Sequence, residues 1–450
     1  MNDLQIAVSA LSAKKPVCDL LYRYYDGQQP LVYSSEKLRE IFSNLAASFT
    51  ANWCAVVVDS VLDRLALRGF SVSDNDAAAA ALDALREQSG LVDDEDAIHE
   101  DVCVTGEAFV MAEMDAAGFI QVFRNDPRLC HAEYESDNPR RLRYAAKWWQ
   151  SDGGVRLNLY YPDRTEYYVA ARAFANGEPP TAQAFEPWGD EPVMPNAWGV
   201  IPVFHFRTSR RSIKSQLDGV IELQNAINKL LADMMVAAEF AAYRQRFVIS
   251  QAGVTGLKNV PFGIWDIPGG DGTGQPTSVG EFSHTPLSNY LEALNKLASD
   301  IGIITRTPRH YFFAQGGDPS GEALIAMEAP LNRKVARLQT ALAPTWRDLG
   351  AFLLLLAGAP VPSQSIWINY EPPQTVQPRT AAEIRKLSVE AGIPLTTVLR
   401  DEGWTDADLQ EMADDEQETR VRQASYADAV LEQAQRQFDA GSEFDAGSVA

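Results

Sequence analysis

Two apolar helical segments with a short β-rich stretch between them constrain the fold of this chain more than any other feature. In residues 217–243, apolar side chains recur every three or four positions, which is the spacing of one helix face. Residues 286–305 repeat that pattern after strand-like runs at 246–249 and 263–267. A helix that leaves a body and returns through a second helix forms a projecting stalk, which cannot cover its own apolar stripe. We therefore expect several copies of the chain to assemble.

The ends and the second face of these helices are also predicted. Thr285 is the expected N-cap of the returning helix, with Pro286 at its first position. The other face of the first helix carries its polar residues, which are Asp218, Glu222, Asn225, Asn228, Lys229 and Asp233.

The first two hundred residues divide into a helical part and a β-rich part. Residues 1–105 are predicted to be mainly helical. One helix is expected to start at 33–38, a second to span 53–67, and a third to run from Asp76 to a C-cap at Gly90. Residues 107–206 alternate β-rich runs with turn signals such as Asn138-Pro139 and Pro162-Asp163, which predicts an antiparallel sheet region. Within it, the Pro-rich residues 177–195 are expected to form a surface loop.

A Gly- and Pro-rich stretch at 307–321 separates the stalk from a long helix at 322–358. That helix contains Pro330 and Pro344, and each removes a backbone donor, so the helix must bend or be two or three shorter helices. A strand at 366–370 and a proline linker follow. Beyond them, a capping box at 380–383 opens a helical, acidic C-terminal part. The predicted fold class is α+β.

Charge and motifs exclude several classes of function. With a net charge of −22, the chain does not hold nucleic acid by bulk attraction, although it could surround DNA. No phosphate-binding loop, zinc-protease motif or nucleophile elbow is present. The four cysteines form no C-x-x-C pair and are typical of reduced core or surface residues. His205 is typical of a hydrogen-bonded strand histidine. We expect no enzymatic activity, no cofactor, no bound metal and no membrane segment.

Four stretches in this order and spacing resemble one known family. They are Tyr24-Tyr25-Asp26-Gly27, the run Trp198-Gly199-Val200-Ile201-Pro202-Val203, the helix at 217–238, and Asp318-Pro319-Ser320-Gly321-Glu322-Ala323-Leu324. Nearly the whole chain resembles the portal proteins of tailed bacteriophages, the head–tail connector family of long-tailed phages.

The resemblance implies a division of the chain into named parts. These are a mixed α/β wing (1–206), a first stem helix (207–243), a small β-containing clip (244–285), a second stem helix (286–305), a tunnel loop (306–320), a long kinked helix with a wing strand (321–378), and a helical acidic crown with a tail (379–450). It also implies a homo-oligomeric ring, usually of twelve copies, at one capsid vertex, formed in the host cytoplasm and retained in the virion. Double-stranded DNA, the terminase large subunit, a head-completion adaptor, the major capsid protein and the scaffold are the implied partners.

Candidate interaction residues follow from this division. The tunnel-loop candidates for facing DNA are Arg306, Arg309, His310, Tyr311, Phe312, Phe313, Gly316, Gly317 and Ser320. The basic candidates of the stem are Arg207, Arg210, Arg211 and Lys214, and those of the clip interface are Phe247, Ile249, Ile264, Trp265 and Ile267. The basic side chains either contact DNA or pair with nearby carboxylates. The aromatic side chains of the tunnel loop either pack between neighbouring copies of the ring or contact the duplex.

Two other functions remain as alternatives. A capsid-associated ring adaptor or scaffold would form rings without conducting DNA, and its lumen would be too narrow for a duplex. A nuclease or hydrolase would need carboxylates or histidines converging in one pocket, and the sequence predicts no such cluster.

Overall fold

The structure is a computed structural model, and it divides into two compact units, Met1–Gln374 and Thr375–Ala450. It describes residues 2–29, 51–73, 75–171, 179–209, 211–242, 246–249, 278–281, 286–312, 320–374, 378–402, 404, 409–410, 412–415, 417, 419–420 and 422. The helix start predicted at 33–38 lies outside these residues. Each unit is described by itself.

The first unit begins with helices, as expected, but they are interrupted by a strand. The elements are α1 (Asp3–Tyr25), α3 (Trp53–Leu62), β1 (Leu67–Val72), α4 (Asp76–Gln88) and α5 (Leu91–Thr105). The helix predicted at 53–67 therefore ends five residues early, because Leu67 starts β1, which pairs antiparallel with a strand about three hundred residues away. The predicted start of α4 is confirmed, and Asn75 caps it through the backbone N–H of Ala78.

The predicted β region is antiparallel throughout but forms two sheets. A three-stranded sheet has the order β10-β2-β3, from Val203–Arg207, Glu107–Met114 and Ile120–Asn125. The larger sheet has the order β4-β5-β6-β7-β8, with β9 also paired to β7, and its strands are Cys130–Tyr134, Leu142–Ser151, Gly154–Tyr160, Arg164–Ala170, Phe185–Pro187 and Val193–Pro195. Because β8 and β9 pair with β7, the expectation of a plain surface loop at 177–195 is wrong.

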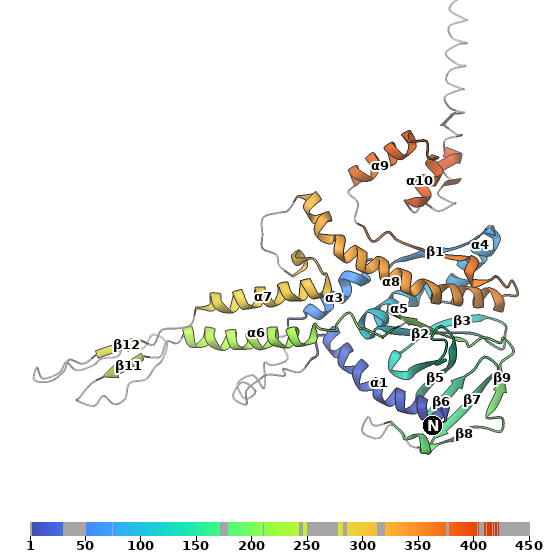
Figure 1. Ribbon diagram of the computed structural model, residues 1–450, viewed down its shortest axis with the longest axis horizontal. Helices are drawn as coiled ribbons and strands as arrows, with labels where there is room; N and C mark the ends of the chain where they lie inside the picture. The colour runs from blue at the N-terminus through green and yellow to red at the C-terminus, as the bar shows by residue number, and fades with distance from the viewer. Residues whose placement is uncertain are drawn as a thin grey trace, which may run out of the picture. The chain divides into compact units, whose positions relative to one another are not determined.

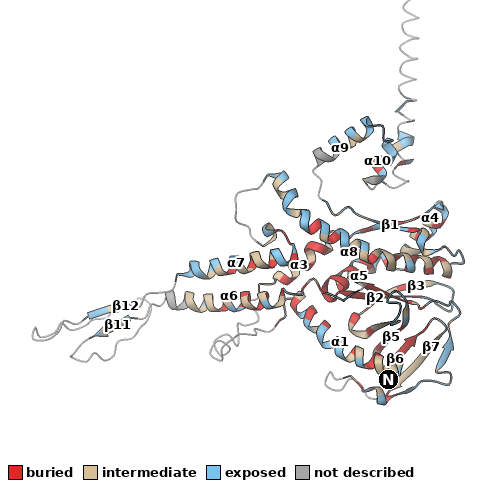
Figure 2. Cartoon of the chain, in the orientation of Figure 1, coloured by how far each residue is buried: buried red, intermediate tan, exposed pale blue. Residues whose placement is uncertain are grey.

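Alternating side chains of the three-stranded sheet build two parts of the core. On β2, Ala108 and Val110 join the large cluster formed with the helices, whereas Phe109 and Met111 belong to a smaller cluster shared with the six-stranded sheet. A third cluster joins α1 to the six-stranded sheet. Figure 2 shows these buried residues at the centre of the first unit.

The stem is a pair of packed helices, α6 (Ile221–Ala242) and α7 (Leu287–Thr305), as Figure 1 shows. The first helix begins four residues later than its apolar pattern suggested. Leu217 and Val220 are buried in a turn before it, where Gly219 takes a φ of +81°. Pro286 is the N-cap of α7, whereas the sequence predicted it at the first helical position after Thr285. The helix therefore begins one residue later than predicted. Beyond the stem, β11 (Arg246–Ile249) pairs with β12 (Ser278–Glu281).

The long helix α8 (Gly321–Leu356) is continuous over 36 residues, with both prolines inside it. Figure 1 shows that it bends, which confirms the bent helix and excludes separate short helices. Strand β13 (Ile366–Tyr370) follows and pairs with β1. None of the helices in the described part of the chain combines the length and apolarity needed to cross a bilayer.

The second unit contains α9 (Pro378–Glu390) and α10 (Leu395–Asp401) in its described part. The predicted capping box is wrong, because α9 already begins at Pro378 and residues 380–383 lie within the helix. Proline fits a first helical position, where no intrahelical N–H bond is lost. Helix α9 ends at Glu390, and Gly392 follows it with a φ of +91°.

Candidate functional site

The base of the stem is held by a buried polar network. Gln224 accepts a 3.0 Å hydrogen bond from the Trp53 backbone N–H and donates one of 3.0 Å to Asn228 Oδ1. It also donates to the carbonyl of Ala51. Asn225 accepts a 2.8 Å bond from the Tyr24 hydroxyl.

Three polar residues of α6 therefore face the body, and all three are buried. Asn225 and Asn228, which were predicted on the polar face of this helix, are buried, because the Tyr24 hydroxyl donates to Asn225 and Gln224 donates to Asn228.

The rest of the stem leaves large apolar side chains exposed. Leu294, Ala298 and Ile301 are buried, but Ile303 is 74% and Ile304 54% exposed. Figure 2 shows exposed residues along α7. One copy therefore covers only part of the apolar surface of its stem, as the periodic pattern implied.

The segment after α7 is fixed to its own body by two aromatic residues. Tyr311 accepts a 2.7 Å hydrogen bond from Arg64 and donates one of 3.3 Å to Glu328 on α8. Arg64 itself lies 3.5 Å from the Glu328 carboxylate. Phe312 packs edge-on against Trp53, with ring centroids 5.8 Å apart.

These contacts place Tyr311 and Phe312, both half-buried, within their own subunit, a position that the sequence did not suggest. Burial raises the pKa of Tyr311, so the hydroxyl stays protonated at neutral pH. We call Arg64, Tyr311 and Glu328 the loop clamp.

The other tunnel-loop candidates surround this clamp. Arg306 ends α7 with a φ of +62°, an uncommon conformation for a residue with a side chain. Arg309 is exposed, and His310 lies 3.8 Å from Glu328. Ser320 caps α8 by accepting from the N–H of Ala323. Phe313, Gly316 and Gly317 lie outside the described residues.

The basic candidates lie in the segment before the stem and not on the stem helix. Arg207 ends β10, where its guanidinium lies 4.0 Å from the ring centre of Tyr134. Arg211 and Lys214 are exposed in the segment that follows, and Arg210 is outside the described residues. Their assignment to the first stem helix is wrong, because the Asp218-Gly219 turn separates them from its start.

The clip candidates are only partly described. Phe247 lies on β11 across from Gly280, where an added Cβ would come within 2.3 Å of the Phe247 ring. That close approach explains the glycine on β12. Ile249 is 65% exposed. Ile264, Trp265 and Ile267 lie outside the described residues. Strand β12 was missed because Ser278-Val279-Gly280-Glu281 contains only one residue that favours strands, whereas β11, of the same length, contains three.

A buried charged cluster links α1 to the three-stranded sheet. Lys14 Nζ lies 2.8 Å from one oxygen of Glu107, and His205 Nε2 lies 2.7 Å from the other. The Tyr134 hydroxyl lies 3.1 Å from His205 Nδ1. Burial would raise the pKa of Glu107, but the hydrogen bond from His205 and the charge of Lys14 lower it to about 2. The prediction of a hydrogen-bonded strand histidine at 205 is confirmed.

The described residues offer no metal site, since no group of three or more His, Cys, Asp or Glu side chains among them could hold an ion. The four cysteines are free and buried, as predicted. Burial is the main cause that raises the pKa of each thiol to about 12, so they remain protonated.

Comparison with known proteins identifies similar chains. The sequence matches the family model "Phage portal protein, SPP1 Gp6-like" over residues 8–422. The portal protein of Mycobacterium phage L5 is 23% identical over 428 residues, covering 86% of this chain and 82% of the relative. The portal protein of Mycobacterium phage D29 is 22% identical over 393 residues, covering 79% of this chain and 76% of the relative.

Two solved structures from gene transfer agent (GTA) particles also align with this chain. One chain from the neck of an empty particle has a TM-score of 0.44 and 12% identity, covering 81% of this chain and 92% of its own length. A chain from the virion of a native particle has a TM-score of 0.46 and 13% identity, with coverage of 81% and 91%.

Proposed function

This chain belongs to the SPP1 Gp6-like family of phage portal proteins, and we propose that its copies close into a ring of twelve at one vertex of the capsid. The observation that carries the proposal is the partly covered stem. Its two helices pack together, yet Ile303 and Ile304 remain exposed on α7. Burying such side chains against an identical neighbour gives a head-to-tail contact that closes when the rotation between copies is correct.

The ring's lumen is the proposed channel for double-stranded DNA during packaging and ejection. A net charge of −22 on each copy disfavours tight binding of phosphates, which suits a channel through which DNA slides. Arg306 and Arg309 are the local cations beside the loop clamp, and they supply the contacts with DNA in this proposal.

The partners of this ring are those of a head–tail connector. The terminase large subunit docks on the clip, the head-completion adaptor joins the ring to the tail, and the major capsid protein and the scaffold surround it during assembly in the host cytoplasm. ATP hydrolysis belongs to the terminase, and the chain has no phosphate-binding loop of its own.

Electron microscopy of the purified full-length chain, viewed along its symmetry axis, tests this proposal. We expect closed rings with an open lumen that admits a DNA duplex. A particle that stays monomeric at every concentration would contradict the ring. A closed ring whose lumen is blocked by its own side chains would favour the alternative, an adaptor that does not conduct DNA.

A further inference from the structure

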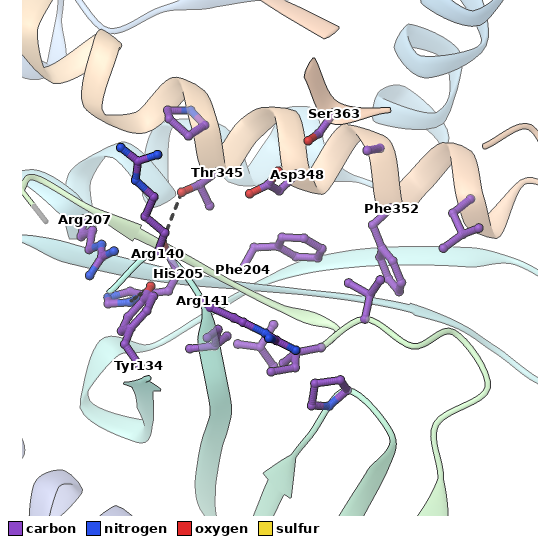
Figure 3. Close-up of a pocket in the computed structure, with 18 of the residues that line it drawn as sticks. Tyr134, Arg140, Arg141, Phe204, His205, Arg207, Thr345, Asp348, Phe352 and Ser363 are labelled. Atoms are coloured by element: carbon purple, nitrogen blue, oxygen red, sulfur yellow. Dashed lines mark hydrogen bonds between the residues drawn. The ribbon is translucent and has the colours of Figure 1, made fainter. Parts of the chain in front are cut away.

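A cavity of about 900 Å³ opens between the C-terminal half of α8, strand β10 with the segment before it, and the turn between β4 and β5. Its floor is apolar and includes Phe204 and Phe352, whose ring centroids are 5.6 Å apart, together with Leu355. Figure 3 shows these rings below α8, with Asp348 on the helix and Arg141 below Phe204 in this view. A cavity of this size accepts several side chains of a partner.

The lip of this cavity carries an excess of positive charge. Arg140, Arg141 and Arg207 line it, with Asp348 as the one carboxylate among the lining residues. Glu135 lies 3.3 Å from Arg141 and offsets part of that charge. In a chain with a net charge of −22, a cationic lip above an apolar floor fits an acidic segment with an apolar tip.

The bend of α8 adds a backbone acceptor to the same wall. Pro344 has no N–H, so it cannot bond the carbonyl of Thr340 four residues earlier. Both residues line the cavity, so the interrupted turn faces it. A partner that brings an N–H to this wall supplies the missing hydrogen bond.

The turn between β2 and β3 has the complementary chemistry. Phe119 at this turn is 70% exposed, and Glu113 beside it is also exposed. Asp115 Oδ1 accepts from the N–H groups of Ala117 and Phe119 at 2.8 and 2.9 Å, which holds the turn in one conformation. A rigid aromatic side chain with carboxylates beside it is well suited to anchor an interface.

We propose that the 113–119 turn of one copy enters the α8 cavity of the next copy in the ring. The inference rests on the proposed ring. In the order β10-β2-β3, β10 borders the cavity at one edge of the sheet, whereas the turn joins the central strand β2 to the other edge strand, β3. The cavity and the turn are therefore different surfaces of one copy, as a repeating head-to-tail contact requires. Phe119 does not line the cavity of its own copy. In the assembly, its ring lies on Phe204 and Phe352, and the carboxylates of Glu113 and Asp115 face Arg140 and Arg141.

Cross-linking between two single-cysteine variants tests this contact. The native cysteines are all buried, so a thiol cross-linker will react with Phe119→Cys and Ser363→Cys, which mark the turn and the cavity. We expect a linked pair of copies in the ring fraction when the two variants are mixed, and none with either variant alone. Asp152→Cys, at the turn between β5 and β6, replaces Phe119→Cys as the matched control.

Assembly measurements give a second test. Phe119→Ser changes an exposed residue, so the fold stays intact, and we expect the concentration for half-assembly to rise roughly tenfold. Arg140→Glu with Arg141→Glu has the same effect, and Glu113→Arg in the same chain partly restores assembly. Normal assembly of the Phe119→Ser variant, together with no linked pair between the Phe119→Cys and Ser363→Cys variants, overturns this contact but leaves the ring standing. If the unaltered chain forms no rings, both proposals are wrong.

Discussion

Lys14 shows at the scale of one residue how this chain keeps a carboxylate in its core. Its ammonium lies 2.8 Å from Glu107 and also donates to the carbonyl of Cys130. A buried carboxylate costs several kcal/mol unless such partners are present. The hydrogen bond from His205 and the charge of Lys14 together lower the pKa of Glu107 to about 2, against the effect of burial.

Replacing Lys14 by Met removes the ammonium and leaves the apolar stem of the side chain. We expect a loss of about 3 kcal/mol in the free energy of unfolding at pH 7, because Glu107 then keeps a buried charge with one partner fewer. Urea unfolding of the unassembled chain measures it. Lys15→Met is the matched control, since the Lys15–Asp19 pair is partly exposed and should change stability by less than about 1 kcal/mol. Equal losses in both variants would contradict this account of Glu107.

His99 provides a test of pH dependence. It is buried beside Trp346, with ring centroids 5.8 Å apart, and burial lowers its pKa from 6.5 to about 4. Between these pH values the unfolded chain binds a proton that the folded chain does not, so stability falls as pH decreases from 6.5 to 4. The loss is about 3 kcal/mol for a shift of this size. In His99→Phe this part of the pH dependence should disappear, which urea unfolding at several pH values checks.

At the scale of elements, the sequence predicted those helices and strands whose pattern of apolar residues and turn signals lies within the element or beside it. The β2–β3 and β6–β7 hairpins and the two stem helices carry their signals within about thirty residues. Strand β13 was predicted although its partner is far along the chain, but β1 was missed because Leu67 continues the apolar pattern of the preceding helix. Gln224 and Asn228 look like solvent-facing residues in the sequence, and only the packing of α3 on α6 shows their partners. The α8 cavity draws on several distant segments, so no local pattern could show it.

The exposed side chains of α7 give a prediction about the stem. Replacing Ile303 and Ile304 by Ser should leave the free energy of unfolding of single copies within about 0.5 kcal/mol, because both residues are mainly exposed. Ring assembly should weaken at least tenfold, since burying each side chain contributes about 1.5–3 kcal/mol. Sedimentation over a concentration series measures it. Ser299→Ala, a change at a partly exposed position on the same helix, is the control, and unchanged assembly in the double variant would remove the stem from the interface.

The contacts of the loop clamp indicate which residues of the tunnel loop can be deleted without disturbing the fold of the subunit. Deleting residues 316–319 keeps Tyr311 in its clamp and Ser320 at the N-cap of α8. We expect such rings to assemble normally but to package DNA poorly, because the shortened loop no longer reaches the duplex. Ser320→Ala is the control, as it removes only the cap and costs about 1 kcal/mol of helix stability. Packaging at the normal rate with the deletion would exclude this role of the loop.

At the scale of the whole molecule, the net charge of −22 must oppose assembly of identical copies. The screening length is about 30 Å at 0.01 M salt and about 10 Å at 0.1 M. We therefore expect the ring fraction, measured by light scattering, to fall when salt is lowered from about 0.1 M to 0.01 M. Arg140→Glu with Arg141→Glu adds four negative charges per copy and should strengthen this dependence.

If the ring fraction instead rises when salt is lowered, local attraction between neighbouring copies outweighs their overall repulsion. Pairs such as Glu113 with Arg140 act over a few Å and involve few charges, whereas the repulsion sums over the whole surface of each copy. Salt also weakens contacts between phosphates and cations. Rings in about 0.1 M salt should therefore be well assembled and hold DNA weakly, and these are the two properties that a channel for sliding DNA requires.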